Sequence, residues 1–212
     1  MTEDKKDPQV TTPSTMTFEV FHSKLKDQLV NQLVEIDRLP TKEEIIKIAS
    51  NPFEVIFIVT EDNKKYSTKW EEGYEFERFK EQVGKVILIA HTHIPANEGS
   101  EEKSKFFSSL PSTSDLTSKS SGAEINYIFN TFGRIAFWPA ENRGPKTEGE
   151  FGDKSMSQQV IGNAMRVGAK EARQQGIKDI PKIINYIGDY IGKIFGTQFQ
   201  FTDWKDVRDP FS

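Results

Sequence analysis

Two histidines separated by one residue, His91 and His93, are the side chains best suited to chemistry in this chain. They follow the apolar run 86–90, whose β-branched composition predicts a strand. Residues i and i+2 of a strand point to the same face, so both imidazoles should project together. Because zinc binds imidazole nitrogen and carboxylate oxygen in a tetrahedral shell, the pair predicts two ligands of a metal site.

The remaining parts of such a site must come from other segments. A catalytic zinc takes three protein ligands and keeps one position for water. Asp115, in a Ser-rich stretch, offers a carboxylate as the third ligand. Glu54 follows an Asn-Pro break and lies at the start of a second β-branched and aromatic run, 53–59, which predicts another strand.

Each of these residues also has a purely structural interpretation. The two imidazoles could be solvated at a sheet edge, and Glu54 could be a solvated residue beside a helix end. Ser112 and Asp115 are both residue types that cap helices well, so either could be a helix N-cap.

The motif His91-Thr92-His93 with Ser112-Thr113-Ser114-Asp115 resembles the H-x-H…S-x-x-D signature of the JAB/MPN (JAMM) zinc metalloproteases. The family also has an upstream glutamate where a helix gives way to a strand, which is the place that Glu54 occupies. The resemblance covers about residues 41–140. It is nearest to the bacterial JAB-like domains of polymorphic toxins and phage-type proteins, which suggests a bacterial effector.

This resemblance implies a role for each residue of the motif. His91, His93 and Asp115 would bind Zn²⁺, and Glu54 would act as the general base on the metal-bound water. Ser112 would stabilise the oxyanion of the tetrahedral intermediate. The implied activity is hydrolysis of a peptide or isopeptide bond in a protein or peptide substrate. The alternative is a catalytically inert JAB-like module that binds a partner in a toxin–immunity, secretion or phage assembly.

Eighteen residues separate His93 from Ser112, where the motif usually has about seven, so we expect an insertion over 94–111. It could form a lid over the site, or it could displace Asp115 from the metal. The apolar pair Phe106-Phe107 in this segment either packs back onto the domain or meets a substrate. Glu71 and Glu72 are fallback candidates for the base.

The periodicity of apolar residues predicts an alternation of helices and strands. We therefore expect an α/β fold with a mixed sheet flanked by helices, and the resemblance narrows this to a cytidine-deaminase-like JAB/MPN fold. The expected domains are a disordered tail (1–16), a metallohydrolase domain (17–140), a linker (141–155) and a helical C-terminal extension (156–212). The expected helices are 18–36, 42–50, 74–83, 114–120, 158–175 and 179–195, and the expected strands are 53–59, 65–70, 86–93, 124–130, 134–138 and 198–201.

Composition excludes several classes of function. The net charge is −4, from 28 basic and 32 acidic side chains, which argues against nucleic acid as the main partner. The absence of cysteine excludes disulfides, thiolate metal sites and a Cys nucleophile. No apolar run is long enough to span a bilayer and the first residues carry no secretory signal, so we expect a protein made in the cytoplasm. Export by a signal-independent route stays open.

Overall fold

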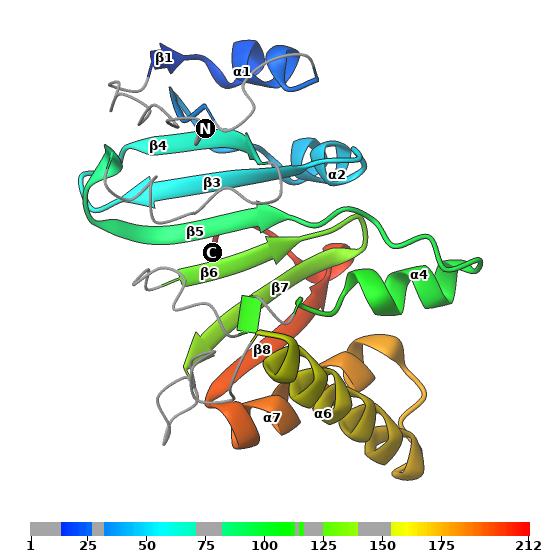
Figure 1. The fold of residues 1–212 in the computed structure, drawn as a ribbon. Helices are drawn as coiled ribbons and strands as arrows, with labels where there is room; N and C mark the ends of the chain where they lie inside the picture. Colours follow the sequence, from blue (N-terminus) through cyan, green and yellow to red (C-terminus); the bar gives the residue numbers. More distant parts are fainter. Residues whose placement is uncertain (1–13, 27–31, 71–81, 113–114, 117–124, 140–153) are drawn as a thin grey trace, which may run out of the picture.

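An eight-stranded mixed sheet forms the centre of the protein in the computed structural model, in the order β1-β2-β4-β3-β5-β6-β7-β8 (Figure 1). The structure describes residues 14–26, 32–70, 82–112, 115–116, 125–139 and 154–212. The predicted α/β class with a mixed sheet is confirmed. Two neighbouring pairs of strands, β1–β2 and β5–β6, are parallel, and the other neighbours are antiparallel.

Three strands of β-branched and aromatic residues form the middle of the sheet. They are β3 (Glu54–Thr60), β4 (Lys65–Trp70) and β5 (Val86–Thr92), as the sequence predicts. β3 and β4 form a hairpin, and its turn is closed by Asn63 in the left-handed conformation, which asparagine tolerates well. β5 pairs with β3 on one side and β6 on the other, so its end lies in the middle of the sheet.

The other half of the sheet is an antiparallel unit of β6 (Ile125–Phe129), β7 (Gly133–Pro139) and β8 (Thr197–Asp203). The predicted hairpin and the predicted short strand are both confirmed. A Cβ on Gly133 would lie 2.3 Å from the Thr202 carbonyl oxygen, so glycine is needed for the close approach of β7 and β8. The segment expected as a helical C-terminal extension thus also supplies a strand to the sheet, followed by a 3₁₀ turn, η2 (Trp204–Asp206).

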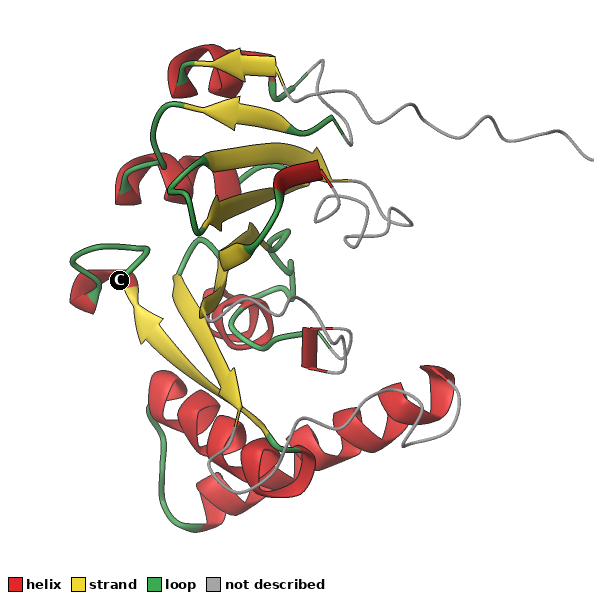
Figure 2. Ribbon diagram, turned by 90° about the vertical axis from the view of Figure 1, so that its left-hand side faces the viewer, coloured by secondary structure: helices red, strands yellow, loops and turns green. Residues whose placement is uncertain are grey.

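Helices cover both faces of the sheet (Figure 2). α2 (Lys42–Ala49), a predicted helix, begins with a capping box between Thr41 and Glu44, and it packs on one face with α1 (Phe18–Lys24). α6 (Lys154–Gln174) and α7 (Ile180–Phe195), both predicted, cover the β6–β8 half of the opposite face. The isoleucine stripe of α7 is buried against β8, where Gly188 allows the two backbones to touch. Among the described residues no helix combines the length and hydropathy needed to cross a membrane.

The predicted long helix over 18–36 is wrong, because among the described residues of that range only 18–24 are helical. α1 ends at Lys24, and Val34–Ile36 forms strand β2, which pairs antiparallel with β4. Val34 and Ile36 alternate with a polar residue and are both buried, which fits a strand better than a helix. The expected disordered tail is also partly wrong, since Ser14–Met16 forms β1 beside β2; residues 1–13 lie outside the described part.

The insertion after β5 contains a helix that we did not expect, α4 (Glu101–Ser108), with Ser100 as its N-cap. Lys105 Nζ lies 2.6 Å from Asp203 Oδ2 at the end of β8, and Phe106 packs against the core beneath α7. The insertion is therefore anchored to the domain through α4. Of the other predicted helices, 74–83 lies mostly outside the described residues, and only 115–116 of 114–120 is described, as helix.

Candidate metal centre

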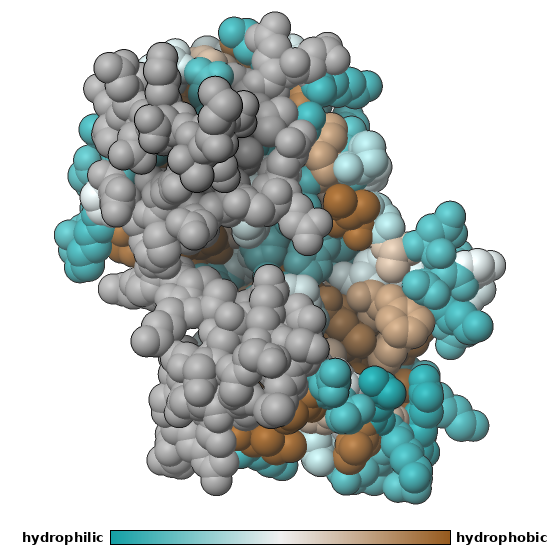
Figure 3. All heavy atoms as spheres, viewed as in Figure 1, coloured by the Kyte–Doolittle hydropathy of each residue, from teal (hydrophilic) through white to brown (hydrophobic). Residues whose placement is uncertain are grey.

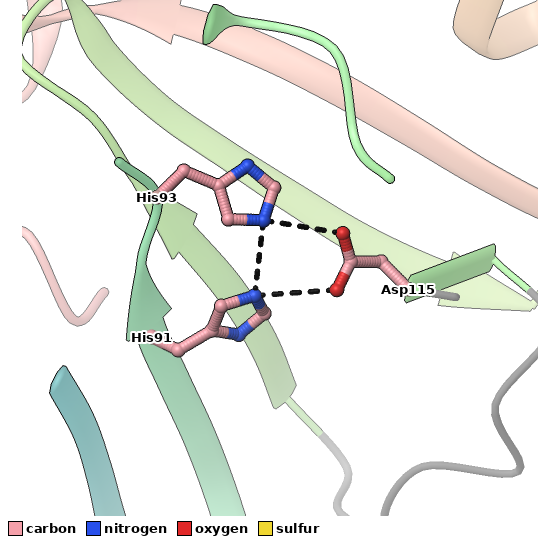
Figure 4. A group of neighbouring side chains, drawn as sticks. All are labelled: His91, His93 and Asp115. Carbon is pink, nitrogen blue, oxygen red and sulfur yellow. Dashed lines mark hydrogen bonds and ion pairs between the residues drawn. The ribbon is translucent and has the colours of Figure 1, made fainter. Parts of the chain in front are cut away.

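His91 and His93 lie at the end of β5 and on one face of the sheet (Figure 4). Their Nε2 atoms are 3.2 Å apart and point toward one another. His91 is paired with Ile56 of β3, and the His93 backbone N–H donates to the Phe129 carbonyl of β6 at 2.8 Å. Both imidazoles are thus positioned by strands on either side, and they project from one face of the sheet, as the strand periodicity predicted.

Asp115 reaches the same point from a segment more than twenty residues further along the chain. Its Oδ1 lies 3.2 Å from His91 Nε2, and its Oδ2 lies 3.2 Å from His93 Nε2 (Figure 4). The three side chains are each only 14–15% exposed. The insertion therefore does not displace Asp115, and the three predicted metal ligands converge.

A local hydrogen-bond pair fixes the Asp115 carboxylate. The Ser112 backbone N–H donates to Asp115 Oδ2 at 2.7 Å, and the Asp115 N–H donates to Ser112 Oγ at 3.1 Å. This reciprocal pattern is that of a capping box at a helix start. Leu116 is buried in the core next to it. Ser112 thus acts as a helix cap, the structural interpretation left open by the sequence, while Asp115 also faces the imidazoles.

The spacing of these atoms fits one small cation. A tetrahedral shell with bonds of about 2.0–2.1 Å places its ligand atoms about 3.3–3.4 Å apart. The observed separations of 3.2 Å between ring nitrogens, and between each ring nitrogen and a carboxylate oxygen, are close to that edge. One ligand atom from each residue can be chosen so that all lie within 4.8 Å of one another. The group could hold a metal ion, and two imidazoles with one carboxylate suit zinc.

Charge coupling within the site shifts two pKa values in opposite directions. Burial works against protonation of His93, but the carboxylates of Asp115 and Glu54 outweigh it and raise the pKa of His93 above its ordinary value. Burial also opposes ionisation of Asp115, yet the two histidines hold the pKa of Asp115 well below its ordinary value. Asp115 is therefore an ionised carboxylate, the form that binds a cation.

Glu54 is the first residue of β3 and lies on the same face of the sheet as the histidines. Ile56 pairs with His91, so continuing the antiparallel register by two residues sets Glu54 opposite His93. The bond from the Val55 N–H to Thr92 Oγ1, 2.9 Å, holds the two strand ends together at this point. The effect of the Glu54 charge on His93 is consistent with this placement. A partly buried carboxylate thus stands beside the three converging side chains.

Two neighbours of the site were not singled out from the sequence. The Trp70 ring, from the strand position that pairs with Glu54, lies edge-on to the His91 ring with centroids 6.3 Å apart. Thr92 is fully buried and holds the end of β3 through its hydroxyl. The sequence could not show that Trp70 is near the site, because that depends on the register between β3 and β4, which pairs Trp70 with Glu54.

The remaining candidates divide between the core and the surface. Phe106 packs back onto the domain, one of the two alternatives expected for the pair, whereas Phe107 is 49% exposed. Ile94, directly after His93, is 51% exposed. In the space-filling view hydrophobic side chains reach the surface beside α4 (Figure 3). Glu71 and Glu72 lie outside the described residues.

Comparison of this chain with protein-family models, curated proteins and solved structures found no match. The chemistry of the site is therefore inferred from the residues and their geometry. The three side chains could hold a metal ion, and the strand register sets a further carboxylate, Glu54, on the same face of the sheet. These are the parts that hydrolysis by a metal-activated water requires.

Proposed function

We propose that this protein is a zinc-dependent hydrolase of the JAB/MPN type that cleaves a peptide or isopeptide bond in a protein or peptide. The observation that carries this proposal is the convergence of His91, His93 and Asp115 on one point, with Glu54 on the same face of the sheet, two residues before the Ile56 that pairs with His91. The mixed α/β sheet is in keeping with the cytidine-deaminase-like fold that the resemblance implies.

The donor set favours zinc over other common cations. Magnesium and calcium prefer shells of oxygen ligands, whereas two imidazoles and a carboxylate are typical of catalytic zinc. Bound there, zinc would polarise the scissile carbonyl and lower the pKa of a coordinated water to about 7. His91, His93 and Asp115 would hold it, with the reciprocal bonds of Ser112 and Asp115 keeping the carboxylate in place.

Glu54 is the proposed general base. Its carboxylate would accept a proton from the attacking water and return that proton to the leaving amine. Ser112 is the proposed oxyanion donor. The Ser112 oxygen accepts a hydrogen bond from the Asp115 N–H through one of its lone pairs. The hydroxyl hydrogen of Ser112 is not used in that bond, so the hydroxyl can still donate to an oxyanion.

Metal analysis of the purified protein is the first test. We expect one equivalent of zinc, which His91→Ala removes. The second test is cleavage of a mixture of peptides and of isopeptide-linked substrates, followed by mass spectrometry. Glu54→Gln should retain zinc and lose hydrolysis. Glu61→Gln is the matched control, because Glu61 lies just beyond the other end of β3 and pairs on the surface with Lys85.

The outcomes separate the proposal from its alternative. Hydrolysis that survives Glu54→Gln would exclude Glu54 as the base. If the protein binds zinc but cleaves none of the peptide or isopeptide substrates, the result would favour an inert JAB-like module that acts as a binding component of a toxin, secretion or phage assembly. Absence of zinc from protein reconstituted with excess metal would end both the zinc site and the hydrolase proposal.

A further inference from the structure

We propose that Asn130 is a positioning residue for the metal centre, which fixes the end of α4 to the end of β6. By doing so it would set the position at which the Ser112–Asp115 segment meets the two histidines. The inference rests on the proposed metal site and extends it to a residue that touches none of the ligands.

Asn130 follows β6 directly, and its side chain is fully buried. Its Nδ2 donates to the Ser108 carbonyl at 2.8 Å and lies 3.5 Å from Ser109 Oγ. Its Oδ1 accepts the N–H groups of Phe132 and Gly133, at 2.7 and 2.9 Å. Both ends of the amide are therefore engaged, and loss of either end would leave buried polar groups unpaired.

The same strand end supports the segment that carries the histidines. The carbonyl of Phe129, the residue before this asparagine, accepts the His93 N–H at 2.8 Å. Beyond His93 the chain stays close to α4, because the Ala96 N–H donates to Ser108 Oγ at 2.9 Å. The segments that bear His93 and Asp115 are thus tied to one short stretch of backbone at the end of β6.

Between the end of α4 and Ser112 the described chain is short and closely held. Pro111 is buried and has a restricted φ, and the capping pair of Ser112 and Asp115 follows at once. Leu116 then anchors the segment in the core. A shift at the end of α4 would therefore be transmitted to the Asp115 carboxylate, whose oxygens must stay within bonding distance of a common point.

The turn between β6 and β7 by itself does not require an amide. Its two bonds are accepted by Oδ1, and aspartate could accept them equally well. Only the bond to the Ser108 carbonyl needs the NH₂ group. Asn130→Asp consequently keeps the acceptor for the turn and removes the connection to α4.

The test compares Asn130→Asp with Asn185→Asp. Asn185 is a matched control, because its Oδ1 accepts the Phe201 N–H at 2.7 Å and its Nδ2 donates to the Phe201 carbonyl at 3.2 Å, away from the metal centre. For each variant we would measure zinc affinity by competition with a chelator, the visible spectrum of the Co²⁺ form, and thermal unfolding without metal.

We expect Asn130→Asp to weaken zinc binding by about 10–100-fold, as loss of a residue that orients metal ligands typically does, and to change the Co²⁺ spectrum. Asn185→Asp should lower thermal stability and leave zinc affinity and the Co²⁺ spectrum as in the wild type. If Asn130→Asp does not fold, Asn130→Ser replaces it. The serine hydroxyl is neutral, can accept the N–H groups of the turn, and lacks the NH₂ group that bonds the Ser108 carbonyl, so zinc binding should again be weaker than in the wild type.

Equal zinc affinities and spectra for the Asn130 and Asn185 variants would overturn the positioning role while leaving the metal site intact. If Asn130→Ser stands in for Asn130→Asp, wild-type zinc affinity in that variant would overturn it likewise. A wild-type protein that binds neither Zn²⁺ nor Co²⁺ would instead refute the proposed function, and with it this inference. The two failures are therefore distinguishable from the wild-type measurement alone.

Discussion

The charge pairing between Asp115 and the histidines predicts a pH-dependent loss of stability in the metal-free Asp115→Asn variant. Asparagine can still accept the Ser112 N–H through its side-chain oxygen, so the substitution removes mainly the negative charge. The charge faces two ring nitrogens at 3.2 Å, and all three side chains are at most 15% exposed. Solvent screening of this interaction is therefore weak.

The size and the pH range of the effect follow from the two pKa shifts. One charged hydrogen bond to a protonated imidazole contributes about 1.5–3 kcal/mol. The raised pKa of His93 stabilises the fold fully below its unfolded value of about 6.5, and that contribution is lost as the pH rises through the folded value. The lowered pKa of Asp115 stabilises the fold above about pH 3.9, and that contribution is lost toward lower pH. The difference between wild type and variant should thus be largest between about pH 4 and 6.5.

Thermal unfolding in a chelator, at pH 5.5 and pH 8.5, is the assay. For a protein of this size 1 kcal/mol corresponds to about 2–4 °C, so the variant should unfold about 3–12 °C lower at pH 5.5 and differ much less at pH 8.5. Asp179→Asn is the control, since asparagine replaces aspartate well at the N-cap of α7 and its effect should be small at both values. A loss of the same size at pH 5.5 and 8.5 would refute the charge pairing.

Further predictions concern the metal and the packing of the helices. Addition of zinc after chelator removal should raise the unfolding temperature, and this rise should be absent in His91→Ala. Gly188→Ala should destabilise strongly, by about 2–4 kcal/mol, because the new Cβ would lie 1.9 Å from the Phe199 carbonyl oxygen. Both glycine variants are measured by denaturant unfolding. Gly162→Ala should stabilise the protein by about 0.5–1 kcal/mol, because alanine favours the helix α6 and a Cβ at this position would meet no atom within 4 Å. Thr41→Ala should cost about 1 kcal/mol through loss of the capping box, and an unchanged midpoint would contradict that role.

The sequence determined most of the elements and the identity of the converging residues. Strong local patterns specify β3, β4, β5, the β6–β7 hairpin and helices α2, α6 and α7, because a period of two or of 3.6 residues is visible without knowledge of partners. The same period placed His91 and His93 on one face of β5. A short local motif likewise identified Asp115, and the reciprocal bonds with Ser112 that orient its carboxylate span only three residues of sequence.

The tertiary structure decided features that depend on long-range pairing. In the sequence, Ile36 continues the helical spacing that begins at Phe18. The segment Val34–Ile36 is a strand because it pairs with β4. Likewise, β8 belongs to the main sheet because it pairs with β7, which its short alternating pattern does not indicate. The convergence of Asp115 with the histidines and the position of Asn130 depend on how α4 packs, and no period in the sequence encodes that contact. Local patterns specify elements and faces, whereas register and packing specify which faces meet.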